Sequence, residues 1–167
     1  EHLKQFDAVI SGVRAYNVHP WLQEKYAILM QYVYEGGNYI VQYNQTGNLP
    51  QKIGPYNFMI SRNRITNEQA TVNFLLPQSS VMQYPNKLSS ADFEGWVQER
   101  SIYEATDFDS LHYQTPFAMH DTGEQPTSGS LLIASYGKGN FVYTGLVFFR
   151  QLPAGVAGAF RLMANLI

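Results

Sequence analysis

The chain has 167 residues, of which 45% are hydrophobic and only 14% charged, so we expect a single domain with one core and a surface of mostly uncharged polar side chains. A formal charge of −2 without any Lys/Arg run argues against a nucleic acid or an anionic membrane as a partner. The absence of cysteine excludes disulfides, thiolate metal sites and thiol nucleophiles.

The first quarter of the chain predicts a βαβ unit. The short apolar run at residues 6–11 is typical of a central strand that is buried on both faces. Apolar residues recur at helical spacing over residues 21–35, and residues 39–43 form a second apolar strand. The residues that set the helical period are Leu22, Tyr26, Leu29 and Val33. Strand, helix and strand in this order predict two parallel strands joined by a right-handed crossover.

The middle of the chain has weaker patterns. Residues 44–67 contain prolines, glycines and polar side chains without a period, which predicts a long loop. Residues 71–76 and 96–103 are predicted strands, and residues 90–94 could form one helical turn.

The last part of the chain predicts a hairpin and a final helix. Residues 131–136 and 141–147 are apolar strands on either side of a four-residue glycine-rich turn. Pro153 then begins a helix with one apolar face, formed by Val156, Phe160, Met163 and Ile167. A parallel start with a late antiparallel hairpin indicates an α/β sandwich with a mixed sheet.

Five segments carry a family resemblance: residues 12–17, 36–38, 93–100, 136–146 and 148–156. Together they resemble the C-terminal region of large bacterial PIG-L type (LmbE-like) deacetylases. That region is similar to the class I glutamine amidotransferase-like fold and, more distantly, to ThuA-like domains. The resemblance implies a flavodoxin-like three-layer sandwich with a mostly parallel sheet, whose first strand and helix would lie upstream of Glu1.

The resemblance also implies that deacetylase chemistry belongs to an upstream domain of the same polypeptide. PIG-L enzymes bind zinc through a His-Pro-Asp-Asp-Glu type motif, whereas His19-Pro20 is followed here by Trp21-Leu22. Amidotransferases need a cysteine, which the chain lacks. We therefore expect no catalytic residue, no metal site and no cofactor in this domain.

Ligands of open α/β sheets bind beyond the carboxyl ends of the parallel strands. We predict such a crevice here, with Arg14 as its principal charged contact, because a guanidinium can grip a carboxylate, a phosphate or paired hydroxyls. The alternative is that Arg14 pairs with an internal acid such as Glu99. The candidate ligand-binding residues are Arg14, Tyr16, Asn17, Asn44, Trp96, Glu99 and Arg100.

Three functions stay open. The first is a non-catalytic accessory domain of a PIG-L type deacetylase that serves its architecture or substrate handling. The second is a carbohydrate-binding module, since several aromatic residues are not clearly core residues: Tyr16, Tyr43, Tyr56 and Trp96. The third is a hydrolase that uses two acids among Glu94, Glu99 and Asp121, which would have to stand about 5 to 10 Å apart around the scissile bond.

The first residues lack the layout of a signal peptide, and no apolar stretch approaches the about 20 residues that span a bilayer. We expect a soluble domain, residues 1–167, cut from a longer polypeptide. Its expected partners are the upstream deacetylase domain and a carbohydrate ligand. The oligomeric state and the compartment stay open, with the bacterial periplasm or cell envelope among the options.

Overall fold

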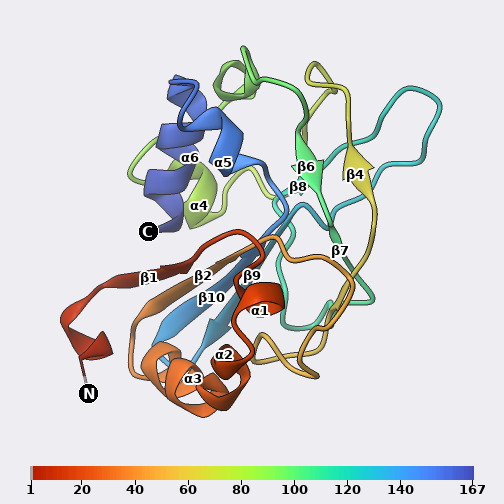
Figure 1. Cartoon of the computed structure of the whole chain (residues 1–167). Helices are drawn as coiled ribbons and strands as arrows, with labels where there is room; N and C mark the ends of the chain where they lie inside the picture. Colours follow the sequence, from red (N-terminus) through yellow and green to blue (C-terminus); the bar gives the residue numbers. More distant parts are fainter. Residues whose placement is uncertain (1) are drawn as a thin grey trace.

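A four-stranded mixed sheet organises the chain in a computed structural model that describes residues 2–167 (Figure 1). The strands, in their order across the sheet, are β1 (Ala8–Ser11), β2 (Asn38–Gln42), β10 (Gly139–Thr144) and β9 (Leu131–Tyr136). The first three are parallel to one another, and β9 pairs antiparallel with β10. The predicted parallel pair, the predicted hairpin and the mixed α/β class are therefore confirmed.

Helices cover both faces of this sheet, and each face has its own core. Phe141 and Tyr143 of β10 are fully buried on one face, where α3 (Tyr26–Tyr34) packs. Val142 of β10 points to the opposite face, because side chains alternate along a strand, and lies in a second core. Helical segments on that side are α4 (Ser80–Gln83), α5 (Phe148–Gln151), α6 (Ala157–Leu166) and the 3-10 turn η2 (Ser90–Phe93).

The predicted helix over residues 21–35 is two helices. α2 (Trp21–Glu24) and α3 meet at Lys25, whose φ of −89° and ψ of 0° interrupt the regular helical geometry. Leu22 and Leu29 are nevertheless both buried. The spacing of apolar residues therefore identified the buried side correctly but did not reveal the break.

The apolar face predicted for the last helix is half right, because Val156 and Met163 are buried but the other two residues are not. Phe160 and Ile167 are 51% and 52% exposed, whereas the buried side chains are Ala159, Leu162, Met163 and Leu166. Gly155 adopts a left-handed φ of 74°, so the helix that the sequence begins at Pro153 starts only at Ala157. Gly158 also faces the backbone of Asp92, where an added Cβ would overlap the carbonyl oxygen.

The interpretation of residues 6–11 as a central strand is wrong. β1 forms one edge of the sheet, and within residues 2–167 no strand pairs with its outer side. Ile10 is 43% exposed and Phe6 is 57% exposed. A short apolar run is compatible with either position, because only the neighbouring strands decide how much of it is covered.

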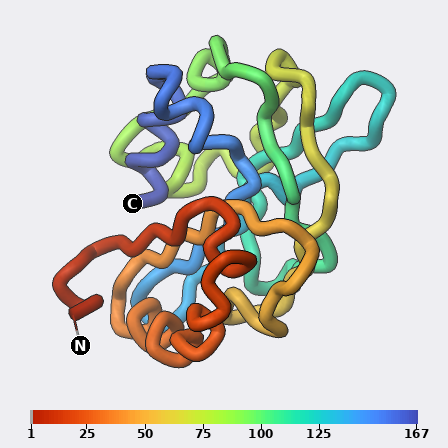
Figure 2. The backbone as a smooth tube through the Cα atoms, viewed as in Figure 1, coloured from red at the N-terminus to blue at the C-terminus, as the bar shows by residue number. Residues whose placement is uncertain are grey.

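Much of the segment between β2 and β9 lies beside the sheet (Figure 2), and this segment contains three short antiparallel pairs. These are β3 (Met59–Ile60) with β7 (Ala105–Thr106), β4 (Arg64–Ile65) with β6 (Ser101–Ile102), and β5 (Asn73–Phe74) with β8 (Phe117–Ala118). The predicted strands 71–76 and 96–103 thus shrink to two residues each, and the predicted loop 44–67 contains two short strands. Two further short elements near the N-terminus are η1 (Leu3–Gln5) and α1 (Ala15–Val18). No helix among the described residues has the length and apolar character needed to cross a bilayer.

The hairpin between β9 and β10 is tighter than predicted. Tyr136 pairs with Gly139, so the connection is a two-residue loop rather than a four-residue turn. Gly137 occupies its first position with a φ of 64°, and an added Cβ would overlap the carbonyl oxygen of Tyr34. Glycine is required here for its backbone freedom and for its lack of a side chain.

We predict that Gly137→Ala destabilises the protein more than Gly95→Ala. Gly95 has a similar φ of 69° but no atom within 4 Å of an added Cβ, so its substitution costs only the left-handed strain, roughly 1 to 2 kcal/mol. Urea unfolding of both variants measures the difference. Equal losses would show that the contact with Tyr34 relaxes freely.

Candidate functional site

The loops that follow β1 and β2 are fastened to each other by amide side chains. Asn44 is fully buried, and its Oδ1 accepts a hydrogen bond from the backbone N–H of Tyr16 at 2.9 Å. Asn17 Oδ1 accepts from the backbone N–H of Gln45 at 2.8 Å, and its amide nitrogen donates to the Gln45 carbonyl at 3.1 Å. Tyr16, Asn17 and Asn44, which the sequence proposed as ligand contacts, therefore hold the two loops together.

Arg14 begins the loop after β1 in a left-handed conformation, with a φ of 59° and a ψ of 18°. Its backbone N–H donates to the carbonyl of Tyr43 at 2.8 Å, while its side chain is exposed. In the described part of the chain its guanidinium has neither an ion-pair partner nor a hydrogen-bond acceptor. The alternative prediction, in which Arg14 pairs with Glu99, does not hold.

Glu99 is instead held between two other arginines. Its side chain is 3% exposed, with Arg64 Nη2 at 2.5 Å from Oε2 and Arg150 Nη2 at 3.0 Å from Oε1. The second contact lies off the hydrogen-bonding direction, so Glu99 Oε1 has no hydrogen-bond partner among the described residues. The buried Arg150 Nε has none among them either. This arrangement connects β4 and α5 to the segment before β6.

Three aromatic rings lie next to these charges, and we call them the aromatic shelf: Tyr43, Tyr103 and Phe149. The Tyr43 ring stacks on Tyr103 with centroids 5.6 Å apart and an interplanar angle of 14°, and lies 5.3 Å from Phe149. The guanidinium of Arg150 lies over the Phe149 ring at 5.1 Å. All three aromatic residues are partly exposed. Burial raises the pKa of Tyr43, and the charges of Arg14 and Arg150 act in the opposite direction.

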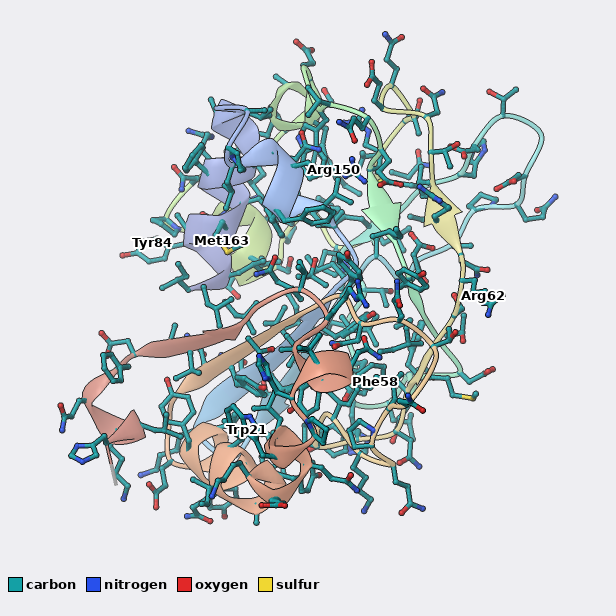
Figure 3. The ribbon with its side chains drawn as sticks, in the orientation of Figure 1. Trp21, Phe58, Arg62, Tyr84, Arg150 and Met163 are labelled. Carbon is teal, nitrogen blue, oxygen red and sulfur yellow. The ribbon has the colours of Figure 1, made fainter. Side chains whose placement is uncertain are left out.

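The sequence reasoning did not select Tyr103, Phe149, Arg150 or Arg64. One signal was available for two of them, since Phe149 and Arg150 follow β10, whose carboxyl end lies at the same edge as those of β1 and β2. Figure 3 shows Arg150 on α5 and Arg62 on the outer side of the molecule.

Trp96 and Arg100 belong to a different cluster from the shelf. Arg100 is 5% exposed, and its guanidinium lies 5.8 Å from the Phe93 ring and 5.7 Å from the Trp96 ring. Its Nε donates to the carbonyl of Ala70 at 3.2 Å and its Nη1 to the carbonyl of Phe93. Burial lowers the pKa of Arg100 to about 10, against the nearby charge of Glu68. These contacts fix the segment before β6.

The acids proposed for a hydrolase are dispersed among different roles. Glu94 is exposed, Glu99 pairs with arginines, and the carboxylate of Asp121 accepts backbone N–H groups of Thr66 and Asn67 at 2.8 and 2.9 Å. Within residues 2–167, no group of three or more histidine, aspartate or glutamate side chains is placed to hold a metal ion.

A buried carboxyl that the sequence did not select is Glu104. It is fully buried and accepts hydrogen bonds from Ser101 Oγ and Thr127 Oγ1, both at 2.5 Å. The described residues include no ion-pair partner for it. Burial raises the pKa of Glu104, and this effect outweighs the two hydrogen bonds, which lower it.

The chain is similar in fold to parts of two solved β-galactosidases. It matches the enzyme from Bacillus circulans sp. alkalophilus with a TM-score of 0.56 and 13% identity, over 99% of this chain and 23% of that one. It matches the cold-adapted enzyme from Rahnella sp. R3 with a TM-score of 0.51 and 15% identity, over 98% of this chain and 23% of that one. No family model and no curated protein sequence matches.

These matches correct the family resemblance. The structural neighbours are β-galactosidases rather than amidotransferase-like or PIG-L type domains, so the assignment to those families is wrong. At 13% and 15% identity the neighbours establish a shared fold only, and this chain spans less than a quarter of their length.

We predict that Glu104→Gln changes the pH dependence of stability. Because the pKa of Glu104 is raised above its ordinary value of 4.5, the neutral carboxyl contributes stability that is complete below that pH and is lost as pH rises through the folded-state pKa. The wild type should therefore lose stability relative to Glu104→Gln as pH rises above about 4.5.

Denaturant unfolding from pH 4 to 8 measures this difference. Glu94→Gln, at an exposed position, corrects for the general effect of replacing glutamate by glutamine. A stability difference between wild type and Glu104→Gln that stays constant with pH would contradict the prediction.

Proposed function

We propose that this chain is a non-catalytic accessory domain of a larger carbohydrate-active enzyme. The observation that carries the proposal is the state of its two buried carboxylates, which lie on the segment next to the strand ends. Glu99 is paired with two arginines, and Glu104 is capped by two hydroxyls. A catalytic acid or base must instead reach a substrate proton within hydrogen-bonding distance.

The structural neighbours support the second part of the proposal. Almost the whole chain matches about a quarter of each β-galactosidase, as expected if it corresponds to one domain of a multidomain enzyme. The finer fold prediction, a flavodoxin-like three-layer sandwich, stays a prediction. Helices on both faces of a mostly parallel sheet support it, and any strand upstream of Glu1 lies outside the described residues.

We expect the purified chain to give no turnover of nitrophenyl glycosides, acidic or neutral, above a protein-free blank. The assay includes Glu99→Gln, Glu104→Gln and, as the matched control, Glu94→Gln. Turnover that is proportional to protein concentration and falls about 100-fold or more in Glu99→Gln or Glu104→Gln, but not in Glu94→Gln, would identify a catalytic acid. That result would overturn the accessory role.

A further inference from the structure

Positive charge is concentrated beside the aromatic shelf. Arg64 and Arg150 both contact a single carboxylate, that of Glu99. Arg14 lies beside Tyr43, whose carbonyl accepts its backbone N–H at 2.8 Å, and its guanidinium has no ion-pair or hydrogen-bond partner in residues 2–167. The chain carries a formal net charge of −2, so this local excess of cations is not a consequence of overall composition.

Unfavourable backbone conformations occur at the same place. Five non-glycine residues in the described part of the chain have a positive φ, among them Arg14 at 59° and Tyr103 at 52°. Such conformations cost free energy and are concentrated at binding and active sites. Two of them belong to the shelf region: Tyr103 stacks on Tyr43, and Arg14 donates its backbone N–H to the carbonyl of Tyr43.

Polar atoms without partners lie next to the rings. Arg150 Nε and Glu99 Oε1 are buried and have no hydrogen-bond partner in the described part of the chain. The Glu99 side chain is 3% exposed, so one of these unpaired atoms belongs to an almost fully buried side chain. Buried polar atoms normally have a partner, and an exception calls for an explanation such as local strain, a bound water or a bound ligand group.

We propose that the aromatic shelf, with Arg14 and Arg150, binds a saccharide that carries a carboxylate, such as a uronic acid residue of a polysaccharide. The apolar face of the sugar ring packs on Tyr43, whose ring is held between Tyr103 and Phe149. The carboxylate accepts hydrogen bonds from Arg14, because a guanidinium matches a carboxylate in a bidentate geometry. This ligand class goes beyond the accessory role proposed above.

The combination of rings and cations distinguishes this ligand from a simple anion. Phosphate or sulfate would use the guanidinium groups but would leave the rings uncovered. A neutral sugar would pack on the rings but would offer no negative charge to pair with the guanidinium of Arg14. Aromatic rings with arginines also bind single-stranded nucleic acid, so an oligonucleotide belongs among the controls.

The test is a titration of the isotope-labelled chain with trigalacturonate, followed by NMR chemical shifts. The matched ligand is the fully methyl-esterified trisaccharide, which keeps the rings and removes the negative charges. Inorganic phosphate and a six-nucleotide DNA strand complete the set. We expect trigalacturonate to shift the signals of residues 14, 43, 103 and 149, and to bind at least about tenfold more tightly than each of the other three.

Variants identify the contacts. Arg14→Gln should weaken binding of trigalacturonate about tenfold, the factor that corresponds to one charge-assisted hydrogen bond, and Tyr43→Leu should weaken it severalfold. Arg62→Gln, at an exposed arginine on the outer side of the molecule, should bind within twofold of wild type (Figure 3). The amide spectrum of each variant shows whether it is folded, and Arg14→Gln alters an exposed side chain, so it tests the site even if Tyr43→Leu does not fold.

Four results would overturn the proposal: no shift at the shelf, equal binding of acid and ester, equal or tighter binding of phosphate or DNA, or unchanged affinity in folded Arg14→Gln. None of these results bears on catalysis. A chain that fails this test and still gives no glycoside turnover keeps its accessory role, and a chain that passes it but hydrolyses glycosides loses that role.

Discussion

The burial of β10 between β2 and β9 is the constraint on which the rest of the structure depends. Phe141 and Tyr143 are completely buried on one face of this strand and Val142 on the other, so β10 belongs to both cores at once. Its parallel pairing with β2 brings its carboxyl end to the edge where β1 and β2 also end. α5 begins a few residues later, and the position of β10 therefore decides where Phe149 and Arg150 lie.

Two kinds of contact hold the loops at the carboxyl ends of the strands, and they differ in how much they stabilise the fold. Asn17 and Asn44 accept hydrogen bonds from backbone N–H groups of the loops. Such hydrogen bonds allow polar backbone groups to be buried without loss of stability. Glu99 with its two arginines is more demanding, because charges that leave water are stabilised only in good geometry, and here one contact is misaligned. The amide contacts therefore stabilise the loops. The cluster of Glu99 and its two arginines contributes less to stability, and its importance lies in the charged groups that it places next to the aromatic shelf.

Local patterns predicted the parallel pair and the hairpin because alternation and helical period are properties of neighbouring residues. They did not predict that β1 is an edge strand or that Phe160 faces solvent, since both depend on which distant segments provide cover. The candidate site also contains residues of both kinds, some predictable from their neighbours in the sequence and others placed by distant segments. Arg14 could be found from its place after a strand, but Tyr103 reaches Tyr43 only through the folding of the long segment between β2 and β9. The resemblance of segments suggested the wrong families, since the structural neighbours are β-galactosidases.

The position of β10 in the sheet also has a consequence for the growing polypeptide. β2 is synthesised early, whereas the strand that pairs with its inner edge is synthesised only after the whole intervening segment. On the ribosome, the apolar side chains of β2 and α3 consequently stay exposed until β10 has been synthesised. An N-terminal fragment without β10 cannot complete the sheet. The nascent chain is therefore most exposed to aggregation just before its last quarter emerges, when a chaperone that shields β2 would be of greatest use.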